Sequence, residues 1–525
     1  MKFLRWAAFV LAGFASASTP AAEPRPERAE VLLRGATLYD GGGGEPKTAD
    51  VALAGGKIVA VGNLATLSAD RTIECRGLAV APGFIDLHNH SDRPIVAPAT
   101  RANVNFLTQG CTTIVTGNCG FGPIDVAAYY RQIDEAGAGT NVAHLIPHGD
   151  LRDAVFGKAD RAPTSAELEK MLTLADRAMR DGAWGMSTGL IYVPGTYAKT
   201  AEIAAVARVV ARHGGFYASH IRNEGRQLLE AVEEAIAIGR EAGCPVHVSH
   251  FKASGRSSWG SLHVAVELIE RERRRGARIT ADQYPYTASS TSLEATVLPA
   301  WSREGGRKGI EARLADPAQR AKIREAVEKS LDDKVRVQIA GYGPRHEYVG
   351  RSLDEIAEAE GRPAADVALE MESRGGARIV NFGMHEDDVI LAMRLPWVAT
   401  ASDGSAKIPD GEQPHPRSFG TFTRKLGVYA LKNRTLSTAQ AVRSSSGLPA
   451  DILGLKDRGY VRPGLAADVV VFDPATIADR ATYDEPFRYS VGVRYVFVNG
   501  TAALFDGVPT GALAGRGLRH ATPGR

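Results

Sequence analysis

Two histidines one residue apart, His88 and His90, close the segment GFIDLHNH, which is typical of a short buried β-strand. Side chains alternate faces along a strand, so both imidazoles point the same way and Asn89 points away. Two nitrogen donors on one face can bind one metal ion. The alternative explanation is a histidine pair that only forms hydrogen bonds within the core.

Four further donors lie at the ends of similar segments. They are Cys119 in IVTGNCG, His220 in FYASH, His250 in VHVSH and Asp403 in VATASD. Each has a structural explanation when taken alone: a buried thiol, two hydrogen-bonded core histidines and an aspartate that caps a helix. His220 and His250 are separated by about one strand-helix-strand repeat, so we expect them at the same level on neighbouring strands.

Six donors at the ends of five predicted strands are difficult to assign to packing. A soft thiolate with two imidazoles suits zinc, and an open fourth position would hold water. The pattern therefore predicts a zinc site. The remaining histidines considered lack this joint support, and we expect them to be surface or structural residues: His144, His148, His213 and His346.

The elements that must position these donors repeat a regular rhythm from about residue 82 to 445, in which a short apolar strand precedes an amphipathic helix. We predict strands at GFIDLHNH, TTIVTGNCG, VAHLIPHG, AWGMSTGLIY, GGFYASHIR, PVHVSHFK, ARITADQYPY and WVATASDG. Eight such units predict an α/β fold, a closed (β/α)8 barrel with its active site at the C-terminal ends of the strands. Residues 288–375 are too many for one loop, so we expect an insertion over the barrel mouth.

Both ends of the chain have a different texture, with short β-like runs between glycine turns. We expect a small antiparallel sheet over residues 31–80. It should pair with the other end of the chain in one β-sandwich domain, made of 29–80 and 446–515. The catalytic barrel would then span 81–445.

The N-terminus has the pattern of a secretory signal. Lys2 and Arg5 precede an apolar run from Trp6 to Ala15, and small residues follow. The run is shorter than the roughly 18 apolar residues that span a bilayer. We therefore expect a signal peptide over residues 1–22, cleaved after Ala17 or near Ala22, and an exported protein, periplasmic or secreted, without stable membrane insertion.

The composition favours a small-molecule partner. The 525 residues include 63 basic and 60 acidic side chains in mixed order, which gives no electrostatic footprint for nucleic acid. The oligomeric state is left open. The cysteines are too few for a disulfide framework, and with Cys119 as a metal ligand at most one disulfide remains among Cys75, Cys111 and Cys244.

Beyond these residues, the sequence resembles the amidohydrolase superfamily and, within it, the D-aminoacylases, which are N-acyl-D-amino-acid deacylases. The resemblance covers nearly the whole mature chain. The motifs that carry it, in the family's order, are PGFIDLHNH, GNCG, SHIRNEG, SHFKASG, DQYPYTASST, ASDG and HPRSFGTF. It implies zinc-dependent hydrolysis of the amide bond of an N-acyl-D-amino acid, and the D configuration rests on the resemblance alone.

The resemblance also implies a role for each matching residue. Ligands of a tightly held zinc are Cys119, His220 and His250, and those of a second, weaker metal position are His88, His90 and Asp403. Asp403 also matches the catalytic carboxylate. Substrate contacts are implied for Arg417, which would bind the substrate carboxylate, and for Lys252, Tyr284 and Tyr192.

The sequence departs from the family pattern at two points. The loop between Asp403 and the HPR motif is slightly long, which puts side-chain specificity in question more than the reaction. Phe251 stands where a second histidine is common.

In the implied reaction, Asp403 accepts a proton from the attacking water and then protonates the leaving amine. That role favours a pKa above the roughly 3.9 of free aspartate, whereas metal coordination opposes such a shift. One alternative is a dipeptidase or cyclic-amide hydrolase on the same scaffold, which would have no need of HPR. The other is a non-catalytic barrel, which should lack metal ligands, and none is missing.

Overall fold

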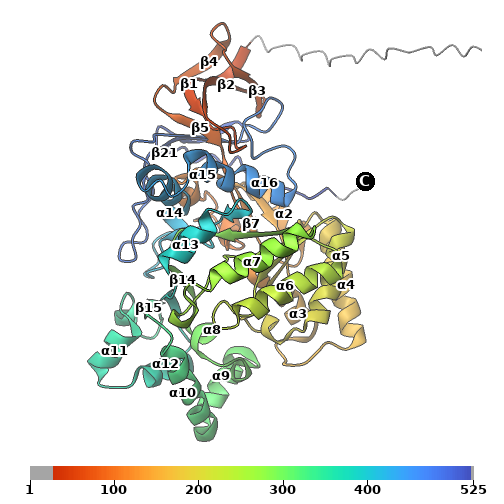
Figure 1. Cartoon of the computed structure of the whole chain (residues 1–525), viewed down its shortest axis with the longest axis vertical. Helices are drawn as coiled ribbons and strands as arrows, with labels where there is room; N and C mark the ends of the chain where they lie inside the picture. Colours follow the sequence, from red (N-terminus) through yellow and green to blue (C-terminus); the bar gives the residue numbers. More distant parts are fainter. Residues whose placement is uncertain (1–27, 522–525) are drawn as a thin grey trace, which may run out of the picture.

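The structure, a computed structural model, describes residues 28–521 (Figure 1). The predicted signal peptide over residues 1–22 lies outside the described residues. Within 28–521, none of the helices combines the length and the apolar character needed to cross a membrane.

The centre of the molecule is a barrel of parallel strands, as the strand-helix rhythm predicted. All eight predicted strands form, and the third is divided in two at Leu145. One part of the wall has the order β6-β7-β8, and the other has the order β9-β10-β11-β12-β13-β17. The strands are β6 (Phe84–Asp86), β7 (Cys111–Thr116), β8 (Asn141–His144), β9 (Ile146–Pro147), β10 (Gly185–Gly189), β11 (Phe216–His220), β12 (Val246–Val248), β13 (Ile279–Gln283) and β17 (Val398–Thr400).

The barrel closes just beyond the ends of β6 and β17. The amide of Asp403 donates a hydrogen bond to the carbonyl of His88 (2.8 Å), and the amide of His90 donates one to the carbonyl of Gly404 (2.7 Å). Asn89 and Gly404 form the parallel bridge between them. The predicted (β/α)8 fold is therefore confirmed, and its closing seam runs through three of the predicted metal ligands.

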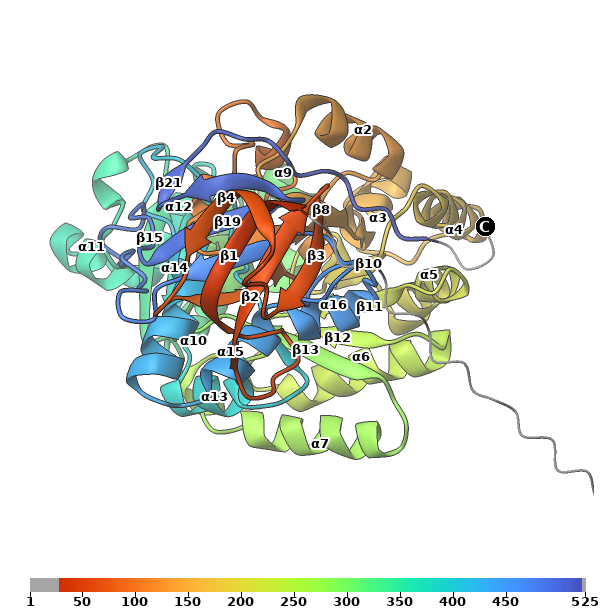
Figure 2. The ribbon, with the colours of Figure 1, turned by 90° about the horizontal axis from the view of Figure 1, so that it is seen from above.

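Amphipathic helices surround the barrel (Figure 2). In α5, Ile203, Val206 and Val210 are buried at helical spacing, whereas Arg208 and Arg212 lie outside the core. The helices and short helical turns of the barrel are α1 (Val104–Leu107), α2 (Val126–Ala136), α3 (His148–Phe156), α4 (Ser165–Arg180), α5 (Thr200–Arg212), α6 (Leu228–Ala242), α7 (Leu262–Arg274), α13 (Glu386–Met393), α14 (Arg417–Arg424), α15 (Thr438–Ser445), η1 (Pro94–Val96), η2 (Asn118–Gly120), η3 (Gly195–Tyr197) and η4 (Arg256–Ser258).

The last described residues run along the N-terminal end of the barrel, opposite the predicted active site. The indole of Trp184 donates a hydrogen bond to the carbonyl of Leu518 (2.6 Å), and the Leu518 amide donates to the carbonyl of Val142 (2.8 Å). Leu518 packs in one cluster with Leu453 of α16 (Gly447–Leu453) and with Ile85 of the first barrel strand. Chain segments far apart in sequence thus stabilise this end of the barrel together.

The two ends of the chain join in one nine-stranded sheet, which lies at the top of the molecule in Figure 1. It is mixed rather than antiparallel, because β1 is parallel to both β4 and β5. In β18, Val469 and Val471 face the core of the small domain, and Val470 and Phe472 face the barrel side. The strands are β1 (Arg28–Leu38), β2 (Lys47–Ala54), β3 (Lys57–Gly62), β4 (Ser68–Glu74), β5 (Ala79–Pro82), β18 (Val469–Phe472), β19 (Val493–Val498), β20 (Thr501–Phe505) and β21 (Val508–Pro509).

The insertion after β13 forms a subdomain at the end of the molecule opposite the nine-stranded sheet (Figure 1). It contains helices, as expected, and also an antiparallel sheet with the order β14-β16-β15, so that it extends to Phe382. It has its own hydrophobic core. Its elements are β14 (Ala288–Ser292), α8 (Leu293–Val297), η5 (Ala300–Arg303), α9 (Gly306–Ala315), α10 (Pro317–Leu331), β15 (Arg336–Gly341), η6 (His346–Tyr348), α11 (Leu353–Glu360), α12 (Ala364–Ser373) and β16 (Arg378–Phe382).

All four cysteines are buried, and their thiols are free. No disulfide joins Cys75, Cys111 and Cys244, the three that the sequence left open. Burial raises the pKa of Cys75 to about 12 and that of Cys244 to about 11, so both stay neutral thiols. Cys119 differs and belongs to the site described below.

A lysine is buried where the π-helix η7 (Lys425–Lys432) packs on the barrel. The ammonium of Lys425 donates a hydrogen bond to the hydroxyl of Thr400 (2.8 Å), and no carboxylate among residues 28–521 forms an ion pair with it. Burial lowers the pKa of Lys425 to about 7. Above about pH 7 the folded chain therefore holds this side chain mainly as the neutral amine.

The pH dependence of stability should reveal this lysine. Because the pKa falls from 10.5 in the unfolded chain to about 7 in the folded one, the unfolded state binds more protons between these values. The free energy of unfolding should rise with pH there, by up to about 1.4 kcal/mol per pH unit from this residue. Urea denaturation at pH 7, 8 and 9 should show a smaller slope for Lys425→Met. Lys432→Met, an exposed control at the end of η7, should keep the wild-type slope, and equal slopes for all three proteins would contradict the assignment.

Candidate active site

The six predicted metal ligands meet at the C-terminal ends of the barrel strands. The structure brings them together in three overlapping groups, each with its donor atoms within 4.8 Å of one another. The groups are His88, His90 and Cys119; Cys119, His220 and His250; and His88, His250 and Asp403. They come from five strands, β6, β7, β11, β12 and β17, as the strand-end argument requires.

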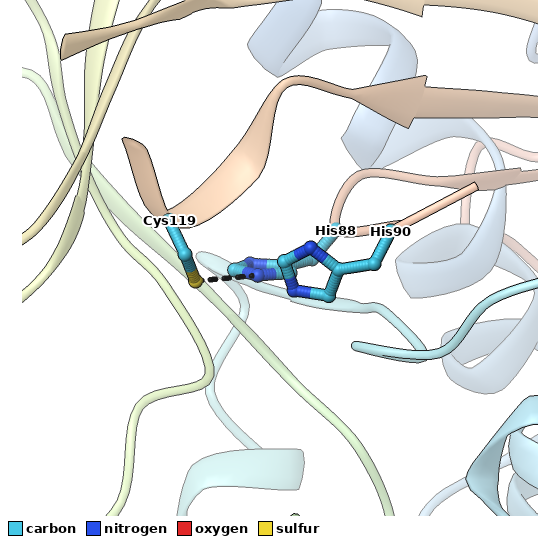
Figure 3. A group of neighbouring side chains, drawn as sticks. All are labelled: His88, His90 and Cys119. Atoms are coloured by element: carbon cyan, nitrogen blue, oxygen red, sulfur yellow. Dashed lines mark hydrogen bonds between the residues drawn. The ribbon is translucent and has the colours of Figure 1, made fainter. Parts of the chain in front are cut away.

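Cys119 is the common neighbour of three histidines. Its Sγ lies 3.3 Å from His88 Nε2, 3.6 Å from His220 Nδ1 and 3.7 Å from His250 Nε2. Figure 3 shows the sulfur pointing at the His88 ring, with His90 beside it. The thiol therefore lies where one metal or two could share it.

Asp403 faces the same cluster from the last strand. Its Oδ1 lies 3.0 Å from His90 Nε2 and 3.5 Å from His88 Nε2. His90 is the most accessible of these side chains, at 32% exposed, whereas the ring of His88 is fully buried. A ligand can thus approach the cluster from the His90 side.

The spacing of Cys119, His220 and His250 fits a tetrahedral zinc ion. Sulfur at about 2.3 Å and nitrogen at about 2.0–2.1 Å from zinc stand roughly 3.5 Å apart in that geometry. The two sulfur-nitrogen distances of 3.6 and 3.7 Å agree with this value. Three protein ligands leave the fourth position open, as in catalytic rather than structural zinc sites.

Three of the six residues have a left-handed backbone conformation that only glycine adopts freely. The φ angles are 53° at Cys119, 37° at His250 and 51° at Asp403. Such residues cost of order 1–3 kcal/mol each and persist where their surroundings hold them. Because three such residues lie in one cluster, the orientation of these side chains comes at a cost in folding stability.

The surrounding charges favour the ionised forms of both anionic ligands. Burial raises the pKa of the Cys119 thiol, but the charge of His88 and hydrogen bonds from His220 and His250 outweigh it and hold the pKa well below its usual range. A thiolate is the form that binds metal. Burial also raises the pKa of Asp403, yet Arg417 and His88 lower it well below that of a free aspartate. The raised pKa favoured by its implied catalytic role is thus absent from the free protein.

Two carboxylates that the sequence reading missed hold the histidine rings. Glu224 lies 2.8 Å from His250 Nδ1. Asp282 accepts a hydrogen bond from the His250 amide (2.7 Å) and lies 3.5 Å from His88 Nδ1. Such partners fix the orientation of metal-binding histidines. The available signal for Asp282 was its position within the predicted strand ARITADQYPY, and that for Glu224 was its place four residues after His220.

The predicted substrate contacts lie beside the cluster and are engaged with it. Arg417 Nη1 is 2.8 Å from Asp403 Oδ2, and its guanidinium lies 4.9 Å from the Tyr284 ring centre. The Tyr192 ring packs edge-on against His220, with 5.1 Å between ring centres. Their contacts with a substrate stay predictions.

Lys252, the fourth predicted substrate contact, is buried with its ammonium turned toward protein groups. It donates a hydrogen bond to Glu224 (2.5 Å), and its Nζ lies 2.7 Å from His250 Nδ1. It therefore helps to orient a predicted zinc ligand. Phe251, which departs from the family pattern, points away from the cluster into the core, where its ring packs against Trp397.

The histidines expected to be structural or on the surface lie outside the three donor groups. His144 and His148 are buried, and His148 Nε2 lies 3.3 Å from Glu202. His213 lies 2.8 Å from Asp176 near the surface, and His346 is exposed in the insertion.

Comparison with known proteins agrees with this geometry. The sequence model of the amidohydrolase family matches residues 71–503. The chain is 36% identical to D-aminoacylase of Alcaligenes xylosoxydans xylosoxydans over 93% of its own length and 97% of that protein. It is 35% identical to N-acyl-D-glutamate deacylase of the same organism, over 94% and 97% of the two chains.

A solved structure extends the similarity to three dimensions. The N-acyl-D-glutamate deacylase of Bordetella bronchiseptica, in complex with zinc and a phosphonate inhibitor that mimics the tetrahedral intermediate, superposes with a TM-score of 0.81 at 34% identity. The match covers 94% of this chain and all of that one. The chain therefore belongs to the amidohydrolase family and, within it, to the D-aminoacylases.

Proposed function

We propose that this protein hydrolyses the amide bond of N-acyl-D-amino acids, giving a carboxylate and a free D-amino acid. The observation that carries the proposal is that Asp403 joins two parts of the site. Its carboxylate pairs with Arg417 at 2.8 Å and also lies among the donor atoms of the thiolate-imidazole cluster. This places an anchor for a carboxylate beside a proton acceptor and a metal site. The similarity to D-aminoacylase and to N-acyl-D-glutamate deacylase supports the same substrate class.

Zinc is the metal that this donor set and the zinc-complexed relative support. Cys119, His220 and His250 would hold the tightly bound ion, and His88, His90 and Asp403 a second, weaker one. Bound zinc lowers the pKa of water and polarises a carbonyl. The chain's own residues must then orient the substrate and move the protons.

Asp403 is the group placed to move protons. Its carboxylate would accept a proton from the water that attacks the acyl carbon, and would then deliver it to the amine nitrogen as the C–N bond breaks. In the free protein Arg417 holds the pKa of Asp403 low. A substrate carboxylate bound to Arg417 would compete for that guanidinium, so the pKa of Asp403 should rise when substrate binds.

The first test compares matched N-acetyl-D- and N-acetyl-L-amino acids as substrates of the wild-type protein and of Asp403→Asn. Asparagine keeps the shape of the side chain and tolerates the left-handed backbone. We expect D-selective hydrolysis whose kcat/KM falls by about 100- to 10,000-fold in the variant. Zinc analysis should show the tight site still loaded.

Full activity in Asp403→Asn would remove the carboxylate from the mechanism. Zinc-loaded wild-type protein that cleaves neither enantiomer would leave the barrel and metal site intact but overturn the deacylase assignment. Dipeptides and cyclic amides would then be the next substrates, since a dipeptidase or cyclic-amide hydrolase would use the same cluster.

The anchoring role of Arg417 predicts a split between charged and neutral substrates. Lysine cannot form the two parallel hydrogen bonds of a guanidinium with a carboxylate. Arg417→Lys should therefore raise KM strongly for an N-acyl-D-amino acid and less for its neutral C-terminal amide. Arg424→Lys, on the same helix but paired with Asp479, is the matched control. Equal losses on both substrates would contradict the anchoring role.

We also propose that the protein is exported, to the periplasm or beyond the cell. The support is the N-terminal sequence alone, in which Lys2 and Arg5 precede the apolar run from Trp6 to Ala15. The full-length chain expressed in a bacterium with two membranes should appear in the periplasmic fraction without its first 17 to 22 residues. N-terminal sequencing would identify the cleavage point. A chain that stays in the cytoplasm with these residues attached would contradict the proposal.

A further inference from the structure

A cleft of about 590 Å³ lies between the barrel loops and the insertion. Residues 222–227 after β11 and Ser254 after β12 form its barrel side. Residues of β14, α8 and α10 form its other side. The volume lies within the roughly 300–1,000 Å³ of small-molecule sites. The cleft is therefore large enough for a substrate that extends beyond a small N-acyl group.

One side of this cleft is next to the predicted substrate contacts of the active site. Cleft residues, or a direct neighbour of one, form hydrogen bonds with three of the predicted substrate contacts. The pairs are Glu224 with Lys252 (2.5 Å), Thr291 with Tyr192 (2.8 Å), and Ser290, next to cleft residue Ser289, with Arg417 (3.2 Å). The cleft therefore borders the predicted substrate contacts across a single layer of hydrogen-bonded residues.

Two of the charged residues in the cleft are already balanced within the protein. Glu224 forms an ion pair with Lys252 at 2.5 Å. Arg222 forms an ion pair with Glu234 at 2.8 Å. These two contribute little net charge to the cleft.

Three cations of the cleft are not balanced in this way. Within residues 28–521, no carboxylate lies within ion-pair distance of Arg226, Lys329 or Lys334. Asp333 is the one other acid in the lining, and it accepts a hydrogen bond from the Ser257 amide (2.9 Å). The uncompensated charge of the cleft is therefore positive.

Lys334 is the most enclosed of the three. Burial lowers its pKa, an effect that Asp333 opposes. An anion placed in the cleft would stabilise the charged form of this lysine, because it would replace the solvation that burial removes.

We propose that this cleft binds a second anionic group of the substrate, a carboxylate borne by the side chain or by the acyl group of an N-acyl-D-amino acid. The inference rests on the proposed function and narrows its substrate class. Sequence similarity does not decide the matter, because the chain is 36% identical to D-aminoacylase and 35% identical to N-acyl-D-glutamate deacylase. The positive charge of the cleft is the observation that favours an anionic substrate.

The experiment compares substrate pairs that differ only in charge. N-acetyl-D-glutamate against N-acetyl-D-glutamine tests an anion on the side chain. N-succinyl-D-leucine against its neutral succinamoyl counterpart tests an anion on the acyl group. We expect kcat/KM of the zinc-loaded protein to favour the anionic member of at least one pair by about ten-fold, the effect of a hydrogen-bonded charge.

Variants then connect that preference to the cleft. In the double variant Lys329→Met/Lys334→Met, the ratio of kcat/KM for the anionic over the neutral member should fall about ten-fold. Lys322→Met, an exposed lysine of α10 that does not line the cleft, should leave the ratio unchanged. The pair that responds identifies which part of the substrate occupies the cleft.

Failure of this inference differs from failure of the proposed function. Cleavage of all four substrates without a charge preference, or a preference that survives in the double variant, would overturn the role of the cleft and leave the deacylase activity standing. If zinc-loaded protein cleaved no N-acyl-D-amino acid, the proposed function would fall, and this inference with it.

Discussion

The seam that closes the barrel is the constraint on which the rest of the site depends. The backbone bond from Asp403 to His88 joins the last strand to the first, and the next bond, from His90, continues it. Asp86 supports the seam, because its buried carboxylate accepts a hydrogen bond from the Ser402 amide (2.8 Å). Closing the barrel and bringing three metal ligands together are therefore one event. A change that opened the seam would separate the donors before it exposed much of the core.

Burial makes this arrangement costly, and neighbouring charges offset the cost. An unpaired charge in the interior is destabilising, so buried ionisable groups require partners. Glu224 pairs with both His250 and Lys252. Asp282 pairs with His88 and also with His247, from which it lies 2.8 Å. The same contacts hold residues with strained backbones. The partners of the histidines thus have two effects: they orient the imidazoles and they keep charged groups stable without water.

The sequence allowed the strand ends to be predicted because their signals are local. The positions of His220 and His250 follow from strand texture and from the rule that barrel sites lie at C-terminal ends. The carboxylate partners were not predicted, since only the packed barrel shows that Glu224 faces His250. The parallel pairing of β1 with β4 and β5 was missed for the same reason, because pairing across a sheet leaves no local pattern. Lys252 shows the limit of motif matching, because the motif located the residue but not the groups that its ammonium contacts.

The ion pair of Arg417 with Asp403 couples substrate binding to proton transfer. Without substrate, Arg417 keeps the carboxylate ionised and weakly basic. A substrate carboxylate would draw on the same guanidinium and add negative charge nearby, and both effects raise the pKa of Asp403. The proton acceptor would then gain basicity when an amide is in place. Recognition of the α-carboxylate would therefore increase the rate of the chemical step as well as affinity, since part of the binding energy is used to prepare the catalytic group.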